Sequence, residues 1–180
     1  IKRTVTGEEA LKKIELLMNQ AGINQNLSPA RSAALLKEET TGGPAGAMVL
    51  PDGRVVTGKT GNLLGAASAL LMNALKGVSG VDDELYVISD DVLEPICHLK
   101  TAHLRSHNPR LHSDETLLAL SISSVSNPLA AELIDNADKL RGCDAYFSVI
   151  ISAADEKLYR TLGINVCCEP KYEQHRYYHK

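Results

Sequence analysis

Apolar residues and turn residues in the middle of the chain predict a β-hairpin followed by a buried helix. Residues 46–50 are apolar and residues 55–57 are β-branched, and the Asp52-Gly53 turn before the second strand, expected at 54–57, is typical of a hairpin. Leucine and alanine then recur at helical spacing over residues 63–75, with Asn62 as the expected N-cap. Because small residues fill the first turns, we expect this helix to lie close against the sheet.

Two helices are expected before the hairpin. Thr6 and Glu9 form a capping-box pattern for the first, and Ser28-Pro29 provides an N-cap and a first-turn proline for the second. The run 40–44, rich in glycine and threonine, ends the second helix and is the expected boundary before the sheet. The first helix should turn these apolar residues toward a core: Ala10, Leu11, Ile14, Leu17 and Met18.

Strands and helices alternate through the rest of the chain. We expect an interior strand at 84–89, helices from residue 90 and from residue 113, another helix at 128–140, a strand at 144–151, a helix at 152–162 and a strand at 164–168. This order predicts an α/β fold, a three-layer α/β/α sandwich with a mixed sheet. The expected parts are a helical segment at 1–43, an α/β domain at 44–170 with a helical insertion at about 108–141, and a tail at 171–180.

Composition and charge narrow the class of protein. The 180 residues carry a net charge of −3 without a basic stripe, so nucleic acid is disfavoured as a partner. We expect no membrane span and no secretion signal, since the chain has neither a long apolar run nor a charged leader. The four cysteines lack a C-x-x-C spacing, and we expect reduced thiols in a cytoplasmic protein. The absence of an initiator Met suggests the later part of a longer protein.

A phosphate-loop pattern, Gly53 followed by four residues and then Gly58-Lys59-Thr60, lies in the same stretch. Residues 54–57 are more typical of a strand than of a loop, which favours a chance match. A weaker hypothesis stays open: the turn before the apolar helix binds an anion through its cation, hydroxyls and free N–H groups. The alternative is a solvated lysine beside a helix cap. The candidate ligand-binding residues are Thr57, Gly58, Lys59, Thr60 and Asn62, with Arg141 as a second cation.

The order of elements resembles the cytidine-deaminase type of fold, which allows a test of mechanism. Those enzymes bind zinc through H-x-E and P-C-x-x-C motifs at two helix starts. Here the corresponding segments read Leu64-Gly65-Ala66-Ala67 and Pro95-Ile96-Cys97-His98, which lack the ligands and the general acid/base Glu. We therefore expect no zinc deaminase activity and assign no metal ligand.

Three other groups of residues could carry chemistry, and each has a simpler interpretation. His103 and His107 share helical spacing for a metal, although solvated histidines are favoured. Asp114-Glu115 could be an acid/base pair, or two acids favoured by the start of a helix. Cys143 beside Arg141 could be a reactive thiolate, or part of a helix end with a glycine cap.

The chain carries motifs spread over nearly its whole length: Val56-Thr57-Gly58-Lys59, Ala66-Ala67-Ser68-Ala69, residues 117–123, Asn127-Pro128, Leu140-Arg141-Gly142-Cys143, Asp155-Glu156, Leu162-Gly163-Ile164-Asn165, Cys168-Glu169-Pro170 and Tyr178-His179-Lys180. Together, these motifs resemble the C-terminal part of the bacterial domain of unknown function 1846 family. The resemblance implies a cytoplasmic bacterial protein, a larger N-terminal region and deaminase-like topology, but no reaction. The chain departs from the family pattern at Thr60-Gly61-Asn62, usually Asn-Ser-Pro, and at Gly65, usually His.

Two hypotheses about function follow. In the first, the domain binds a small phosphorylated or anionic ligand, or a nucleotide, at the turn of residues 57–62 and shares an active site with the rest of a longer protein. In the second, it is a structural or oligomerisation domain with no site of its own. Substrate, reaction, cofactor and assembly state have no signal in the sequence.

Overall fold

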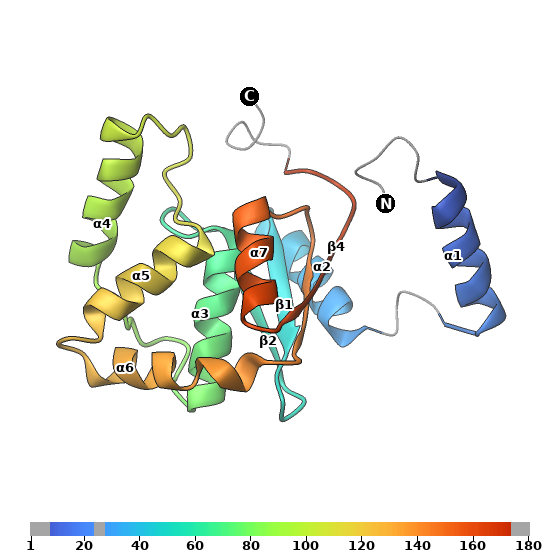
Figure 1. Cartoon of the computed structure of the whole chain (residues 1–180), viewed down its shortest axis with the longest axis horizontal. Coiled ribbons are helices and arrows are strands. Elements are labelled where there is room, and N and C mark those ends of the chain that lie inside the picture. Colours follow the sequence, from blue (N-terminus) through green and yellow to red (C-terminus); the bar gives the residue numbers. More distant parts are fainter. Residues whose placement is uncertain (1–7, 24–27, 174–180) are drawn as a thin grey trace.

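A computed structural model describes residues 8–23 and 28–173, and Figure 1 shows their arrangement. The helices are α1 (Glu8–Gln20), α2 (Pro29–Thr41), α3 (Ala66–Ser79), α4 (Asp90–His98), α5 (Ser113–Ser123), α6 (Pro128–Asp135) and α7 (Ala153–Thr161). A π-helical segment (Leu99–His103) extends α4, and a short 3-10 helix (Ala137–Leu140) follows α6. The strands are β1 (Ala45–Val49), β2 (Val55–Lys59), β3 (Asp144–Phe147) and β4 (Asn165–Cys168). The chain is therefore of the α/β class.

The strands form one mixed sheet in the order β2-β1-β3-β4. β1 pairs antiparallel with both β2 and β3, and β3 pairs parallel with β4. β2, β3 and β4 consequently run in one direction and end at the same side of the sheet, here called the carboxyl edge. In α/β proteins, ligands bind preferentially at this kind of edge.

The predicted hairpin is confirmed. Val49 pairs with Val55, and the Leu50 N–H donates to the carbonyl of Arg54 to close the turn. Gly53 has φ +84°, a left-handed conformation that favours glycine. Gly58 and Lys59 belong to β2, so the residues that would have to form a phosphate loop are a strand, and that interpretation is wrong.

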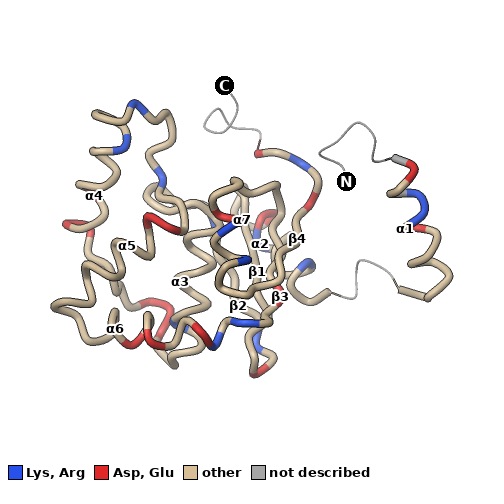
Figure 2. Tube along the Cα trace, viewed as in Figure 1, with Lys and Arg blue, Asp and Glu red and all other residues tan. Residues whose placement is uncertain are grey.

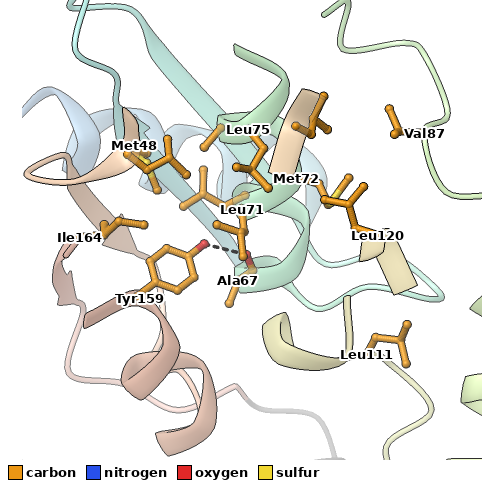
Figure 3. Close-up of a cluster of buried hydrophobic side chains, with 14 of the residues drawn as sticks. Met48, Ala67, Leu71, Met72, Leu75, Val87, Leu111, Leu120, Tyr159 and Ile164 are labelled. Atoms are coloured by element: carbon orange, nitrogen blue, oxygen red, sulfur yellow. Dashed lines mark hydrogen bonds between the residues drawn. The ribbon is translucent and has the colours of Figure 1, made fainter. Parts of the chain in front are cut away.

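Helices cover both faces of the sheet. On one face, Ala30 and Ala34 of α2 pack against Ala47 of β1. On the other face lies α3, with a larger core that includes Phe147 and Tyr159 in edge-to-face contact, their ring centroids 5.4 Å apart. The Tyr159 hydroxyl donates to the Ala67 carbonyl at 2.7 Å, which joins α7 to α3 in the core (Figure 3).

The expected strand at 84–89 is wrong. That segment is irregular, and the Tyr86 side chain is 92% exposed. The place beside β1 is occupied by β3, which comes almost sixty positions later in the chain, so no edge of β1 remains for an earlier strand. The residues between α3 and β3 instead form a helical layer, from α4 to the 3-10 helix.

The expected start of the apolar helix is also wrong. The N-cap of α3 is Gly65 and not Asn62. Leu64 bridges to Leu111, the Leu111 N–H donates to the Leu63 carbonyl, and the Gly65 N–H donates to the Leu111 carbonyl. This extended pairing delays the helix by three residues, so its first N–H groups are not in the predicted turn.

The first helix, α1, lies apart from the sheet in Figure 1. Ile14 and Leu17 are 41% and 63% exposed, so the expectation that they face a core within the described chain is wrong. Thr6 lies outside the described residues, as does the side chain of Leu11. Helical periodicity is present in α1, but nothing in the described chain covers its apolar face.

Charged residues of both signs are interspersed along the described trace (Figure 2). Within residues 8–23 and 28–173, none of the helices has the length and apolar character needed to span a bilayer.

Candidate functional site

Two cavities open near the carboxyl edge of the sheet, and the predicted turn at residues 57–62 contributes to both. Thr60 lines a cavity of about 200 Å³, which we call the Asp155 cavity. Lys59 and Asn62 line a cavity of about 500 Å³, which we call the lysine cavity. The turn therefore lies next to concave surface, as an anion site requires.

The turn is tied to α3 by a hydrogen bond between a side chain and the backbone. Asn73 of α3 donates from Nδ2 to the Thr57 carbonyl at 2.9 Å. Gly58 is buried beneath α3, whereas Lys59 and Asn62 are exposed at the rim. Thr57 and Gly58 thus position the turn, and Lys59 and Asn62 are the residues available to a ligand.

Lys76, near the end of α3, also lines the lysine cavity. It is 8% exposed, and Nζ donates to the Asp83 carbonyl at 2.7 Å. Burial lowers the pKa of Lys76, because the apolar surroundings disfavour the charged form, and the nearby Asp83 and Asp82 oppose that shift. The cavity therefore has one lysine at its rim and one within its wall.

Acidic and apolar side chains complete the lysine cavity. Asp83 and Glu84 contribute acids from the segment before α4, and Asp90 contributes one from the first residue of α4. Leu64 and Met72 belong to the apolar lining of the cavity. A cavity with apolar walls and a few charged groups is typical of small-molecule sites. The arrangement suits a ligand that has an anionic group, hydroxyls and an apolar part.

The Asp155 cavity lies at the starts of α3 and α7. Gly65 and Ala66 line it from α3, and Ser152 and Asp155 line it from α7. Gly65 provides no side-chain cap, whereas Ser152 accepts a hydrogen bond from the Asp155 N–H. Thr60 and Ser152 add hydroxyl groups to this lining.

Asp155 is 5% exposed and accepts four hydrogen bonds from three residues. Oδ1 accepts from the Ser113 N–H at 2.8 Å and the Ser113 hydroxyl at 2.7 Å. Oδ2 accepts from the Ser152 hydroxyl at 2.6 Å and lies 3.2 Å from His112 Nδ1. Burial alone would raise the pKa of Asp155, but the His112 ring and the serine donors outweigh it and lower that pKa.

The interaction with Asp155 raises the pKa of His112, although burial of the ring acts in the opposite direction. Ser152 Oγ is 3.4 Å from the same ring nitrogen, Nδ1. In a Ser-His-Asp triad the serine and the carboxylate contact opposite ring nitrogens. Ser152 is therefore not placed as a triad nucleophile, and the cluster instead joins the starts of α5 and α7.

Arg141 does not lie with the turn. It precedes β3, whereas Lys59 ends β2, and these two strands run in the same direction. Lys59 is thus at the carboxyl edge, and Arg141 lies at the opposite ends of the strands. The Arg141 side chain packs over Gly163, where an added β-carbon would be 2.9 Å from Cγ of Arg141.

The other candidate residues from the sequence make contacts that stabilise the fold. Glu115 accepts from the His112 N–H at 2.7 Å and pairs with Lys100 at 2.6 Å, which confirms a role at the start of α5. Cys143 is buried and burial raises the pKa of its thiol, so a reactive thiolate is wrong there. Among the described residues, His, Cys, Asp and Glu form no group of three that could hold a metal ion.

Sequence reasoning missed Lys76 and the cluster around Asp155. Lys76 had one visible signal, since it is the single charged residue in an otherwise apolar helix. Asp155 gave the pattern of an ordinary acid in the first turn of a helix. Its partners Ser113 and His112 lie some forty residues away, so that the network is a product of the fold.

Comparison with known proteins places the chain among bacterial relatives. A UPF0371 protein of Corynebacterium efficiens is 42% identical over 179 residues, which cover 99% of the chain and 36% of the relative. UPF0371 proteins of Corynebacterium glutamicum and Streptococcus pneumoniae are each 44% identical, over 93% and 99% of the chain and 34% and 36% of the relative. The chain thus spans about a third of the length of these relatives. The profile of the C-terminal domain of unknown function DUF1846 matches residues 26–178, and the chain therefore belongs to that family.

Proposed function

We propose that this chain provides a binding site for a small phosphorylated or otherwise anionic ligand within a longer bacterial protein. The observation that carries the proposal is the convergence of Lys59 and Lys76 on one cavity of about 500 Å³ beside the turn of residues 57–62. A convex surface around Lys59 would have favoured a merely solvated lysine. The concave surroundings and the second lysine favour a ligand site.

The lining of the cavity indicates the class of ligand. Lys59 and Asn62 donate hydrogen bonds to an anionic group at the rim. Asp83 and Glu84 accept hydrogen bonds from ligand hydroxyls, and apolar side chains such as Met72 contact an uncharged part. A nucleotide or a phosphorylated sugar has this combination of groups. Arg141 is not included in the proposed site, because it lies at the other edge of the sheet.

The layers and the topology of the fold can also be inferred. We infer a three-layer α/β/α sandwich of cytidine-deaminase-like topology, supported by the strand order β2-β1-β3-β4 and by helices on both faces. Zinc deaminase activity is not proposed, because Leu64-Gly65-Ala66-Ala67 at the start of α3 and Pro95-Ile96-Cys97-His98 in α4 lack the H-x-E and P-C-x-x-C motifs of that chemistry.

We also propose where the protein is located and what completes its site. All four cysteines are free thiols, which supports a reducing, cytoplasmic location. The relatives are about three times as long as the chain, which supports an active site completed by the rest of such a protein. The small net charge of −3 gives no support for nucleic acid as a partner.

Thermal unfolding of the chain with a panel of nucleotides, phosphorylated sugars and phosphate, with and without Mg²⁺, tests the proposal. A ligand at one hundred times its Kd should add about 2.7 kcal/mol to the free energy of unfolding. We expect the shift to vanish in Lys59→Ala and to persist in the control Lys139→Ala, which changes an exposed lysine outside the cavity. No shift with any compound would overturn the proposal that this chain holds the ligand.

A structural or oligomerisation role is the second candidate, favoured by exposed apolar residues on α5. Leu118 and Ile122, one turn apart, are 65% and 58% exposed, and Val125 just beyond the helix is exposed as well. Such a stripe is typical of an interface with a second copy of the chain. Sedimentation should then show a dimer that Leu118→Asp disrupts, and a monomer at high concentration would contradict this role.

A further inference from the structure

Within residues 8–23 and 28–173, two lysines are more than nine-tenths buried, and their surroundings differ. Lys100 is 7% exposed and forms an ion pair with Glu115, with Nζ 2.6 Å from the carboxylate. Lys76 is 8% exposed, takes part in no ion pair among the described residues, and donates to a backbone carbonyl alone. A buried ammonium without a carboxylate partner is costly, so Lys76 calls for an explanation beyond packing.

The cavity offers that explanation. Lys76 lines it together with Met72 and Leu93, two buried apolar side chains. An amine in such surroundings has a larger neutral fraction, and the neutral amine is the nucleophile. Lys76 thus combines burial with a place in the lining of a cavity of about 500 Å³.

We propose that Lys76 captures a carbonyl compound as an imine in the lysine cavity. The lone pair of Nζ forms a bond to the carbonyl carbon, and the carbonyl oxygen leaves as water with the two protons of the neutral amine. No oxidant or reductant takes part. The ligand class is accordingly an aldehyde or ketone small enough for the cavity, with phosphorylated carbonyl compounds favoured by the presence of Lys59.

Several charged groups face Lys76 and set the pH range of the reaction. Asp82 and Asp83 favour its protonated form, and Glu84 and Asp90 add negative charge to the lining. Lys59 opposes them from the rim. Burial is the largest effect and lowers the pKa of Lys76. Capture should therefore begin at a lower pH than for an exposed lysine.

The inference uses the cavity of the proposed function, but it does not need an anion to bind. Two probes separate the two proposals. Benzaldehyde carries a carbonyl and no phosphate, and pyridoxal phosphate carries both. If anion binding fails and carbonyl capture holds, benzaldehyde still labels Lys76, and Lys59→Ala leaves labelling by both probes unchanged.

The experiment incubates the chain with each aldehyde near pH 7, reduces the imine with borohydride, and maps the modified lysines by mass spectrometry. We expect Lys76 to be labelled more heavily than the exposed Lys139, since burial lowers the pKa of Lys76 and so raises its neutral fraction. Lys100 should stay unlabelled because its buried Nζ already donates to the Glu115 carboxylate and to the Arg110 carbonyl. This comparison is made within the unaltered protein, so it does not depend on a variant that folds.

Two variants complete the test. Lys76→Met should remove the label from this position and leave labelling of Lys139 unchanged. Lys59→Ala should reduce labelling by pyridoxal phosphate and leave labelling by benzaldehyde unchanged, if the anion site is also correct. Labelling of Lys76 that is no greater than that of Lys139, with both probes, would overturn the proposal.

Discussion

Gly58 of β2 and Leu70 of α3 approach so closely that a β-carbon on Gly58 would lie 2.2 Å from the Leu70 nitrogen. Real side chains do not reach that distance, so a glycine is required where the helix crosses the strand. The approach brings α3 onto the sheet beside the turn of residues 57–62. It therefore fixes the position of the lysine cavity, although Gly58 itself is not in its lining.

We predict that Gly58→Ala strongly destabilises the chain. The added methyl group meets backbone atoms of α3, which cannot move aside as a flexible side chain could. Overpacking of a core costs about 1 to 3 kcal/mol, and a backbone clash should reach or exceed the upper value. Urea unfolding of the variant measures the loss.

The control for this prediction is Gly61→Ala in the same turn. A β-carbon at Gly61 would meet the Leu64 carbonyl oxygen at 3.9 Å, an ordinary contact. This variant should stay within about 0.5 kcal/mol of the unaltered chain, as most surface substitutions do. Equal losses in the two variants would contradict the explanation by close approach.

Tyr159→Phe should cost about 1 kcal/mol of stability. The Tyr159 side chain is fully buried, and its hydroxyl donates to the Ala67 carbonyl at 2.7 Å (Figure 3). Loss of a buried hydrogen bond of this kind typically costs about 0.5 to 1.5 kcal/mol. Thermal unfolding of Tyr86→Phe, which changes a tyrosine that is 92% exposed, should give no change.

The sequence predicts the elements that depend on contacts between residues close together in the chain. The Asp52-Gly53 hairpin and the apolar face of α3 could be read from residues within one turn or one helix. The start of α3 could not, because Leu111, distant in sequence, pairs with residues 63–65. The strand expected at 84–89 failed for a similar reason, since only the fold shows that β3 occupies the place beside β1.

Part of the candidate site can be predicted from the sequence and part cannot. Lys59 and Asn62 can be proposed from the sequence because a cation and an amide lie together in a glycine-rich turn. Lys76 comes into the cavity from the far end of a core helix, and its role depends on the loop at Asp83. Arg141 was grouped with the turn from its charge alone, and the direction of β3 separates them.

Arg141→Ala should leave the binding of an anionic ligand unchanged. Arg141 precedes β3 at the edge opposite Lys59, and no cavity described above includes it. Titration of the ligand by calorimetry should give the same Kd for Arg141→Ala as for the unaltered chain. Weaker binding in Arg141→Ala with unaltered stability would contradict the placement of the site in the lysine cavity.

The ion pair of His112 and Asp155 should make stability depend on pH in two ranges. The folded pKa of His112 is raised above 6.5, so its contribution is complete below that pH and is lost as the pH rises through the raised pKa. The folded pKa of Asp155 is lowered below 3.8, so its contribution is present above 3.8 and is lost as the pH falls through the lowered pKa. Stability from this pair is therefore greatest between these ranges.

His112→Gln tests this dependence, with urea unfolding measured from pH 3 to pH 9. The difference in stability between the unaltered chain and His112→Gln should be largest between about pH 4 and pH 6.5. It should shrink at higher pH, because neutral imidazole loses its charge attraction to the carboxylate. The matched control is His103→Gln, which changes an exposed histidine of the π-helical segment. This variant should have nearly the same stability as the unaltered chain at every pH. A difference that stayed constant from pH 5 to pH 9 would mean that His112 joins α5 to α7 by hydrogen bonding alone, without charge.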